Sequence, residues 1–353
     1  MKSIVIYFSQ TGNTKTIAQA IQKGIIKQTG QCDIKRLKEI KPEELVNYDP
    51  IGSPVWSSCP TPNVIEFEQS LPLNLKGKHF FFFCTHGVLP GRCIIRGVKP
   101  LQERGMTVIG WKDWYCGACV IGHAKPWFTD GHPDAIDLGE AESFGLAMVE
   151  HSRKISQGAI DIIPVLPSPE ASDQIYGIGH PFIFPLMMSE IKNEDSSEIS
   201  TPVEHCDKSE KKQEGRKLLT SMSYVMELEG MPVKERRPPG GELRINPEKC
   251  TGCGLCAEAC FCNNIVASIF PPVFKSQDCE RDLFCEGVCP TGAIEFEFPS
   301  SDVNTGNMWH IMKRILDLAE ATGRFRRLIR EEDIGWSTPW EVATGHPRHK
   351  IIP

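Results

Sequence analysis

Residues 3–14 have the sequence SIVIYFSQTGNT, a short apolar run that passes into a hydroxyl-rich turn. The run over residues 3–8 suits a buried parallel strand, whose two faces are both covered by other elements. Beyond the turn, apolar residues recur at helical spacing: Ile17, Ala18, Ile21 and Ile25. The segment therefore predicts a strand, a tight turn and a helix, the unit from which α/β domains are built.

The turn is also a natural anion site. Backbone N–H groups and the positive end of the helix dipole both favour negative charge at a helix N-terminus. The turn lacks the GxxxxGK[ST] pattern of nucleoside triphosphate sites and the GxGxxG pattern of dinucleotide sites. Hydroxyls without a cation suit a single phosphomonoester. The expected binding residues are those of the turn: Ser9, Gln10, Thr11, Gly12, Asn13 and Thr14.

This turn resembles the FMN-phosphate loop of flavodoxins, and other segments follow in the order that family has. Residues 51–56 (IGSPVW) resemble the loop after the third strand, where a side chain covers one flavin face. We expect the fourth strand at residues 80–84, the fifth at 106–111 and a closing helix at 139–156. The resemblance covers roughly residues 1–160. It implies a doubly wound parallel α/β sheet, with FMN beyond the carboxyl ends of the strands where strand order reverses.

The same resemblance implies flavin contacts in the loops that follow the third and fourth strands. We expect these from Ser53, Pro54, Val55, Trp56, Thr85, His86 and Gly87. His86 either tunes the flavin or is an ordinary loop residue. Trp114 and Tyr115, after the fifth strand, offer further contacts. Cys116 and Cys119, with His123, have the look of a redox or metal pair, but we favour a flavin-loop segment with free thiols.

Seven of the cysteines between residues 250 and 289 follow a repeated spacing. The first run, C-x₂-C-x₂-C-x₃-C, consists of Cys250, Cys253, Cys256 and Cys260. An offset of 29 residues gives the second: Cys279, Asp282, Cys285 and Cys289. The offset also carries Ile265 onto Ile294, an apolar residue expected to shield each cluster from water. This is the spacing of two-cluster ferredoxins, in which the fourth cysteine of each run binds the neighbouring cluster. A zinc ribbon, with two CxxC pairs, fits less well.

The interlocking rule assigns the metal ligands. One 4Fe–4S cluster takes Cys250, Cys253, Cys256 and Cys289. The second takes Cys260, Cys279 and Cys285, with Asp282 where a fourth thiolate normally sits. A carboxylate is the harder ligand and binds that iron less tightly. The second cluster is therefore either 4Fe–4S with Asp282 as a labile ligand or 3Fe–4S. Cys262, an additional thiol, is expected to be a buried spectator.

Composition narrows the class of protein. At 353 residues the chain should hold two domains plus connections, and its net charge of −6 argues against nucleic-acid binding. No apolar run approaches the ~18–20 residues needed to span a bilayer. With seven of the 15 cysteines assigned as cluster ligands and no signal peptide before the first strand, we expect a cytoplasmic protein of a reducing, anaerobic cell.

We expect four parts along the chain. A flavodoxin-like domain over residues 1–160 precedes a packing segment, polar linker and short helix over 161–239. A small α+β two-cluster ferredoxin-like domain follows over 240–299, and then a helical and extended tail over 300–353. Residues 313–330 of the tail carry six basic and two acidic residues. The tail either straps onto the chain's own domains or docks a partner, with Trp336 and Trp340 as anchors.

Taken together, the two halves resemble flavodoxin–ferredoxin fusion proteins, the EFR-type ferredoxins. The resemblance implies an electron-transfer protein that relays electrons between FMN and two iron–sulfur clusters, to or from a partner oxidoreductase. Cofactors carry such chemistry, and no acid–base or nucleophile constellation stands out, so we name no catalytic residue. The alternatives are a free-standing iron–sulfur flavoenzyme that reduces a small molecule at FMN, and an oxygen or iron sensor. A homo-oligomer stays open.

Overall fold

The computed structural model describes residues 2–49, 51–53, 61–117, 126–168, 171, 242–275, 284–297 and 305–334. The chain divides into two compact units. The first comprises Met1–His180, Met312–Ala343 and Ile351–Pro353, and the second comprises Pro181–Ile311 and Thr344–Lys350. The chain therefore leaves the first unit, builds the second and returns to the first.

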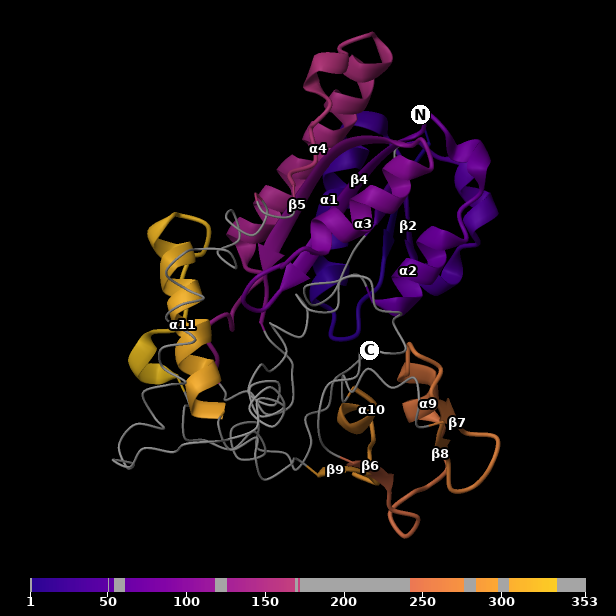
Figure 1. Cartoon of the computed structure of the whole chain (residues 1–353), viewed down its shortest axis with the longest axis vertical. Helices are drawn as coiled ribbons and strands as arrows, with labels where there is room; N and C mark the ends of the chain where they lie inside the picture. The colour runs from indigo at the N-terminus through magenta and orange to yellow at the C-terminus, as the bar shows by residue number, and fades with distance from the viewer. Residues whose placement is uncertain are drawn as a thin grey trace, which may run out of the picture. The chain divides into compact units, whose positions relative to one another are not determined.

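A five-stranded parallel sheet forms the centre of the first unit, in the order β2-β1-β3-β4-β5 (Figure 1). Its strands are β1 (Ser3–Tyr7), β2 (Cys32–Arg36), β3 (Ile51–Ser53), β4 (His79–His86) and β5 (Thr107–Tyr115). The direction of winding reverses between β1 and β3, as in doubly wound sheets of the flavodoxin type. The predicted fold class of this half is confirmed.

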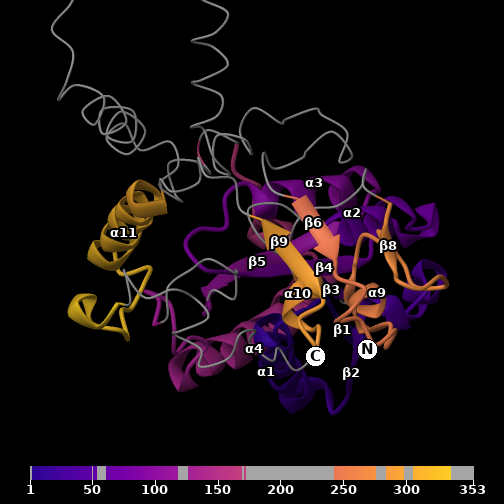
Figure 2. The ribbon, with the colours of Figure 1, turned by 90° about the horizontal axis from the view of Figure 1, so that it is seen from below.

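Helices cover both faces of this sheet, as Figure 2 shows. One face carries α1 (Asn13–Thr29) and α4 (Ala135–Ser156), and the other carries α2 (Pro62–Gln69) and α3 (Cys93–Glu103). Short 3₁₀ turns complete the unit: η1 (Leu37–Glu39), η2 (Pro42–Asn47), η3 (Leu73–Leu75) and η4 (Ile160–Ile162). The apolar stripe predicted from Ile17 to Ile25 is fully buried on α1.

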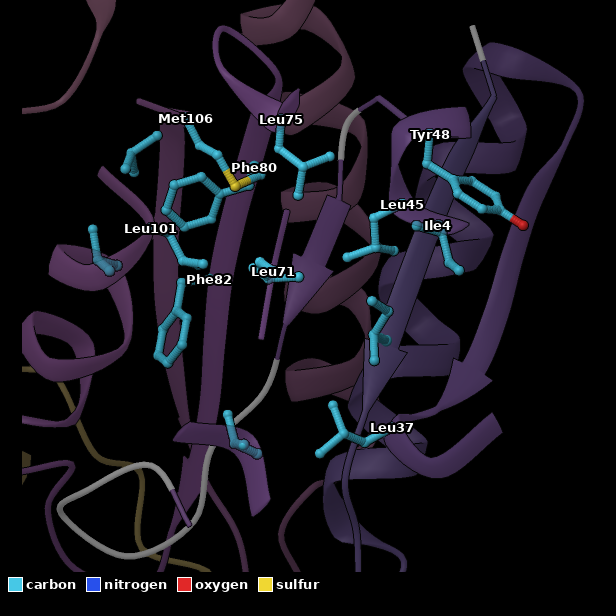
Figure 3. Packing of buried hydrophobic residues seen from close by; sticks show 14 of the residues in the cluster. Ile4, Leu37, Leu45, Tyr48, Leu71, Leu75, Phe80, Phe82, Leu101 and Met106 are labelled. Carbon is cyan, nitrogen blue, oxygen red and sulfur yellow. The ribbon is translucent and has the colours of Figure 1, made fainter. Parts of the chain in front are cut away.

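Strand β4 contributes side chains to the apolar cores on both faces of the sheet, and every one of its residues is buried. Phe80 and Phe82 point into the core beneath α2 and α3, where Leu101 and Met106 also lie (Figure 3). Phe81 and Phe83 point into the core beneath α1 and α4. Burying one such side chain stabilises a fold by about 1.5–3 kcal/mol, so this strand anchors both layers.

Three element boundaries differ from those predicted. Strand β4 spans His79–His86, so Thr85 and His86 lie in the strand and not in the loop expected after it. Strand β5 continues past residue 111 to Tyr115, because its pairing with β4 runs on as far as His86 and Tyr115. Helix α4 begins at Ala135 instead of residue 139, because the carboxylate of Asp134 caps it by accepting hydrogen bonds from the N–H groups of Ile136 and Asp137.

The second unit has a small α+β arrangement. Its elements are β6 (Glu242–Ile245), α9 (Leu255–Ala259), β7 (Ile265–Val266), β8 (Val273–Phe274), α10 (Phe284–Gly287) and β9 (Ile294–Glu297). Strands β6 and β9 pair antiparallel, as do β7 and β8. Adding 29 to the first residue number of α9 gives that of α10. The same offset relates Ile245 to Phe274 and Ile265 to Ile294, so the pairing of β6 with β9 corresponds to the pairing of β8 with β7. The sequence repeat is therefore a structural repeat whose halves exchange strands.

Helix α11 (Thr305–Ala321) is the helix predicted for the tail. It ends before Gly323, whose φ of 72° turns the chain. The segment after it, which includes η7 (Glu331–Asp333), runs back along the helix, since Arg327 pairs with Asp317 and Lys313 with Glu331 (Figure 1). No helix among the described residues is long and apolar enough to cross a membrane.

Two glycines bring the backbones of α1 and α4 into direct contact. A Cβ at Gly24 would overlap the carbonyl oxygen of Glu142, and a Cβ at Gly145 would overlap that of Ile21. Backbone atoms cannot swing aside as side chains can. The two helices therefore pack this closely only because both positions are glycine.

We predict that Gly24→Ala and Gly145→Ala each destabilise the first unit by about 2–4 kcal/mol, because overpacking outweighs the roughly 1 kcal/mol gain in helix propensity. Gly139→Ala, also in α4 but facing open space, is the matched control and should stabilise by up to about 1 kcal/mol. Chemical denaturation measures all three. Equal effects of Gly139→Ala and Gly145→Ala would contradict the close contact.

Candidate cofactor sites

The N-terminus of α1 has the backbone of an anion site. Gly12 precedes the helix with a φ of 96°, and no side chain caps the first turn. The N–H of Gly12 donates to Ser9 Oγ at 3.1 Å, and the N–H of Thr16 donates to the carbonyl of Gly12 at 2.9 Å. Ser9 Oγ accepts a hydrogen bond in the turn, so its own proton stays available to an anion. These features fit a phosphate.

Two side-chain bonds hold this turn at the carboxyl edge of the sheet. Thr14 Oγ1 lies 2.9 Å from Thr85 Oγ1 in a buried pair, which connects the turn to the end of β4. Asn13 Nδ2 donates to the carbonyl of Gly117 at 2.9 Å, just beyond β5. Asn13 and Thr14 therefore also position the turn.

His86 closes β4 with its side chain only 2% exposed. Its Nε2 lies 3.0 Å from Asp113 Oδ2, and its ring packs edge-on against Tyr115 at 4.4 Å between centroids. Its Nδ1 is buried and has no hydrogen-bond partner in the described part of the chain. A buried nitrogen of this kind calls for a partner. A polar cofactor group bound at this loop would fit that need.

The other predicted flavin residues are placed as follows. Ser9, Thr11 and Gly87 are half-buried and Gln10 is buried. Ser53 ends β3, while Pro54, Val55 and Trp56 lie outside the described residues. Cys116 is buried, and Cys119 and His123 also lie outside. Trp114 packs its ring against Phe144 in the core beneath α4, so it supports the fold on that side.

Asp113 and Arg324 are residues that sequence reasoning missed. Arg324 Nη2 lies 3.5 Å from Asp113 Oδ2, the oxygen that also meets His86. The two residues are 211 positions apart. No local pattern in the sequence connects them.

The described ligands of the first predicted cluster gather in the second unit. Cys253 is exposed, Cys250 and Cys289 are half-buried, and Cys256 is buried. Burial raises the pKa of the Cys256 thiol, and the neighbouring Cys253 and Cys289 add to this by charge repulsion. Burial acts in the same direction on Cys289, but hydrogen bonds from Ile294, Thr291 and Ala293 outweigh it and lower the pKa of that thiol. Cys289 thus lies beside the first run, as the interlocking rule requires.

Backbone amides point at the sulfur atoms in a repeated pattern. The N–H of Ala293 donates to Cys289 Sγ at 3.2 Å, and the N–H of Asn264 donates to Cys260 Sγ at 3.3 Å. Both bonds span four residues, and the two cysteines are related by the 29-residue offset. Such bonds favour the thiolate and tune the potential of an iron–sulfur cluster.

The second predicted cluster is only partly described. Cys260 and Cys285 lie in one apolar group with Ile265 and Ile294, the two residues expected to exclude water. Cys279 and Asp282 lie outside the described residues. Cys262 is half-buried, so it is less enclosed than predicted.

The sulfur spacing argues against mononuclear zinc. Two sulfurs on one zinc ion lie at most about 4.6 Å apart, since each Zn–S bond is about 2.3 Å. Among the described residues no three cysteine sulfurs lie within 4.8 Å of one another. The described cysteines therefore form no compact three-sulfur zinc site.

Comparisons with known proteins agree with both halves. The family model for the flavodoxin domain matches residues 4–99, and that for the 4Fe–4S binding domain matches residues 243–266. A flavodoxin from Megasphaera elsdenii is 27% identical over 141 residues, which is 39% of this chain and 95% of the relative.

Solved flavodoxins are also similar. One from the domain Archaea is 24% identical with a TM-score of 0.36, covering 43% of this chain and 99% of its own. The two-electron reduced Megasphaera elsdenii flavodoxin is 22% identical with a TM-score of 0.35, covering 42% and 99%.

The chain joins a flavodoxin-like domain to a 4Fe–4S ferredoxin-type domain. The flavodoxin match contains the turn at the start of α1, and the 4Fe–4S match contains Cys250 to Cys260. The cofactors are accordingly FMN in the flavodoxin-like domain and at least one 4Fe–4S cluster in the ferredoxin-type domain. Both domain types serve electron transfer.

We predict that anaerobically purified chain releases FMN on denaturation, and that Ser9→Ala weakens FMN binding roughly ten- to hundredfold, as expected for one hydrogen bond to a charged group. Thr29→Ala, at the far end of α1, is the control and should bind FMN normally. Flavin titration of the apoprotein measures both. Release of FAD, or no flavin after reconstitution, would contradict the assignment.

Proposed function

We propose that this protein is an electron carrier that relays electrons between FMN and two iron–sulfur clusters, to or from a partner oxidoreductase. One observation carries the proposal: an uncapped, hydroxyl-lined helix N-terminus and a strand-exchanged cysteine repeat occur in the same chain. When bound, FMN accepts one or two electrons and each cluster carries one. The chain's own residues supply the binding, the shielding and the electrostatics.

The residues have distinct tasks in this proposal. The first turn of α1 and the Ser9 hydroxyl hold the phosphate, and the bond between Thr14 and Thr85 keeps that turn against β4. Amides that point at Cys260 and Cys289 favour the thiolates. The apolar group around Cys285 excludes water from the second cluster position.

The ferredoxin-type domain carries an exposed apolar surface beside its first cluster position. Phe270 is 66% exposed, and its ring lies 3.4 Å from where a Cβ of Gly252 would be, within the cysteine loop. Cys253, next to Gly252, is itself exposed. Three more large apolar side chains are exposed in this segment: Leu255, Ile269 and Val273. Exposed apolar groups next to a redox centre suit the docking of a redox partner.

The tail contributes less to docking than its composition suggests. Five of its six basic residues between 313 and 330 pair with carboxylates of the same chain: Lys313, Arg324, Arg326, Arg327 and Arg330. The positive charge is therefore largely balanced. Docking through Trp336 and Trp340 stays a prediction, because both lie outside the described residues.

The cellular setting is part of the proposal. None of the eleven described cysteines is in a disulfide, which suits a reducing compartment such as the cytoplasm of an anaerobic cell. A homo-oligomer stays a prediction. The nuclearity of the second cluster depends on Asp282, as argued from its harder oxygen ligand.

We predict that Phe270→Ser slows electron transfer to a co-purifying oxidoreductase severalfold or more while iron and FMN content stay unchanged. Val165→Ser is the matched control, since Val165 is 89% exposed on the other unit. Stopped-flow reduction of the partner measures the rate. The chain alone should turn over small molecules more slowly than about 1 s⁻¹, the lower end of usual enzyme rates. Faster turnover without a partner would favour the flavoenzyme.

We also predict that mild oxidation of the wild-type protein gives a 3Fe–4S signal in electron paramagnetic resonance, and that Asp282→Cys abolishes it by restoring a fourth thiolate. Asp278→Cys adds a thiol off the repeat position and should leave the signal in place. The same signal in wild type and Asp282→Cys would show that Asp282 is not at the cluster corner.

A further inference from the structure

Residues 324–334, which we name the strap, lie on the first unit after the chain has built the second. Phe325 is only 4% exposed, with its ring 4.8 Å from that of Tyr115 and 5.7 Å from that of His132. Leu328 lies against Gly131, since a Cβ there would be 3.1 Å from Leu328 Cδ1. The strap thus covers the end of β5 and the loop before α4.

His132 lies at the centre of this contact with its side chain 2% exposed. Its Nδ1 is 2.5 Å from Asp137 Oδ2, and its Nε2 is 2.7 Å from the carbonyl oxygen of Arg326. A carboxylate and a carbonyl are both acceptors. Neutral imidazole has one N–H, so it satisfies only one of them. Both bonds form together only when His132 is an imidazolium.

The surrounding charges agree with a protonated ring. Arg326 Nη2 lies 2.7 Å from Asp134 Oδ1 and 3.6 Å from Asp137 Oδ1. Two carboxylates, one guanidinium and one imidazolium balance to zero, whereas a neutral ring leaves one uncompensated negative charge. Burial lowers the pKa of His132, but the bonds to Asp137 and the Arg326 carbonyl outweigh it and raise the pKa above its ordinary value.

Other charged groups packed around this cluster are themselves paired. On the same loop Asp130 accepts from the N–H of Trp127. On β5 Asp113 meets His86 and Arg324. On α4 Glu140 pairs with Lys112.

The same group does not suit a metal ion. Ligand atoms of His132, Asp134 and Asp137 lie within 4.8 Å of one another. The guanidinium of Arg326 already lies against both carboxylates, and both ring nitrogens of His132 point at acceptors. Arg326 therefore takes the place of a cation.

We propose that His132 is a proton-operated latch: the imidazolium holds the strap against the loop before α4, and the neutral ring releases it. A histidine whose pKa is raised in the folded state contributes its full stabilisation below its unfolded pKa of about 6.5. That contribution is lost as the pH rises through the raised folded value. The strap is therefore held in mildly acidic conditions and loosened in alkaline ones.

Limited trypsinolysis of the full chain tests the latch, because the strap contains four arginines: Arg324, Arg326, Arg327 and Arg330. We expect cleavage after Arg326 and Arg327, normalised to a small peptide substrate, to rise roughly ten- to hundredfold from pH 6.5 to 9. His132→Gln, which cannot bear the charge, should be cleaved rapidly at both pH values. His151→Gln is the matched control, since His151 bonds only the carbonyl of Ile109 in the described structure, and should keep the wild-type profile.

Two outcomes would overturn the proposal: a flat profile in the wild type, or an unchanged pH profile in His132→Gln. If that variant does not fold, ¹⁵N spectra of histidine-labelled wild type decide the question. Two protonated ring nitrogens at pH 6.5, with loss of one proton in step with cleavage, would support the latch. A neutral ring in the protected protein would refute it.

Discussion

The close approach of α1 and α4 is the constraint on which the flavodoxin-like domain depends. Gly24 and Gly145 let the two backbones touch, and this contact sets where α1 lies on the sheet. The position of α1 in turn sets the position of its N-terminus. The bond between Thr14 and Thr85 then joins that N-terminus to the carboxyl edge of β4. A contact deep in the helical layer thereby aligns the phosphate loop with the strand ends.

The ferredoxin-type domain positions its cysteines in a different way. Too short to bury a large core, it repeats one unit and exchanges strands between the copies, so each half is completed by the other. As a result, Cys260 and Cys289 each accept a hydrogen bond from the backbone N–H four residues further along the chain. In the sequence the cysteine repeat is broken at Asp282, which stands where the first run has Cys253.

Local burial explains what could be predicted from the sequence. The strand at residues 80–84 and the apolar stripe of α1 were correct because a doubly covered sheet demands them. The boundaries of β4, β5 and α4 were wrong because strand pairing and the Asp134 cap, not hydropathy, decide them. The contacts of Arg324 with Asp113 and of Arg326 with His132 could not be foreseen. Each joins residues about two hundred positions apart that carry no shared motif.

The return of the chain to its first unit has a consequence for biosynthesis. Arg326 follows Asp134 by 192 residues, so at about 5–20 residues per second the strap leaves the ribosome roughly 10–40 s after its binding surface. During that interval the nascent flavodoxin-like domain folds with the rings of Tyr115 and Phe128 uncovered by their later neighbours. Closing so long a loop costs little more entropy than closing one half its length, about 0.6 kcal/mol. Docking of the strap thus marks a chain whose iron–sulfur segment has already been translated.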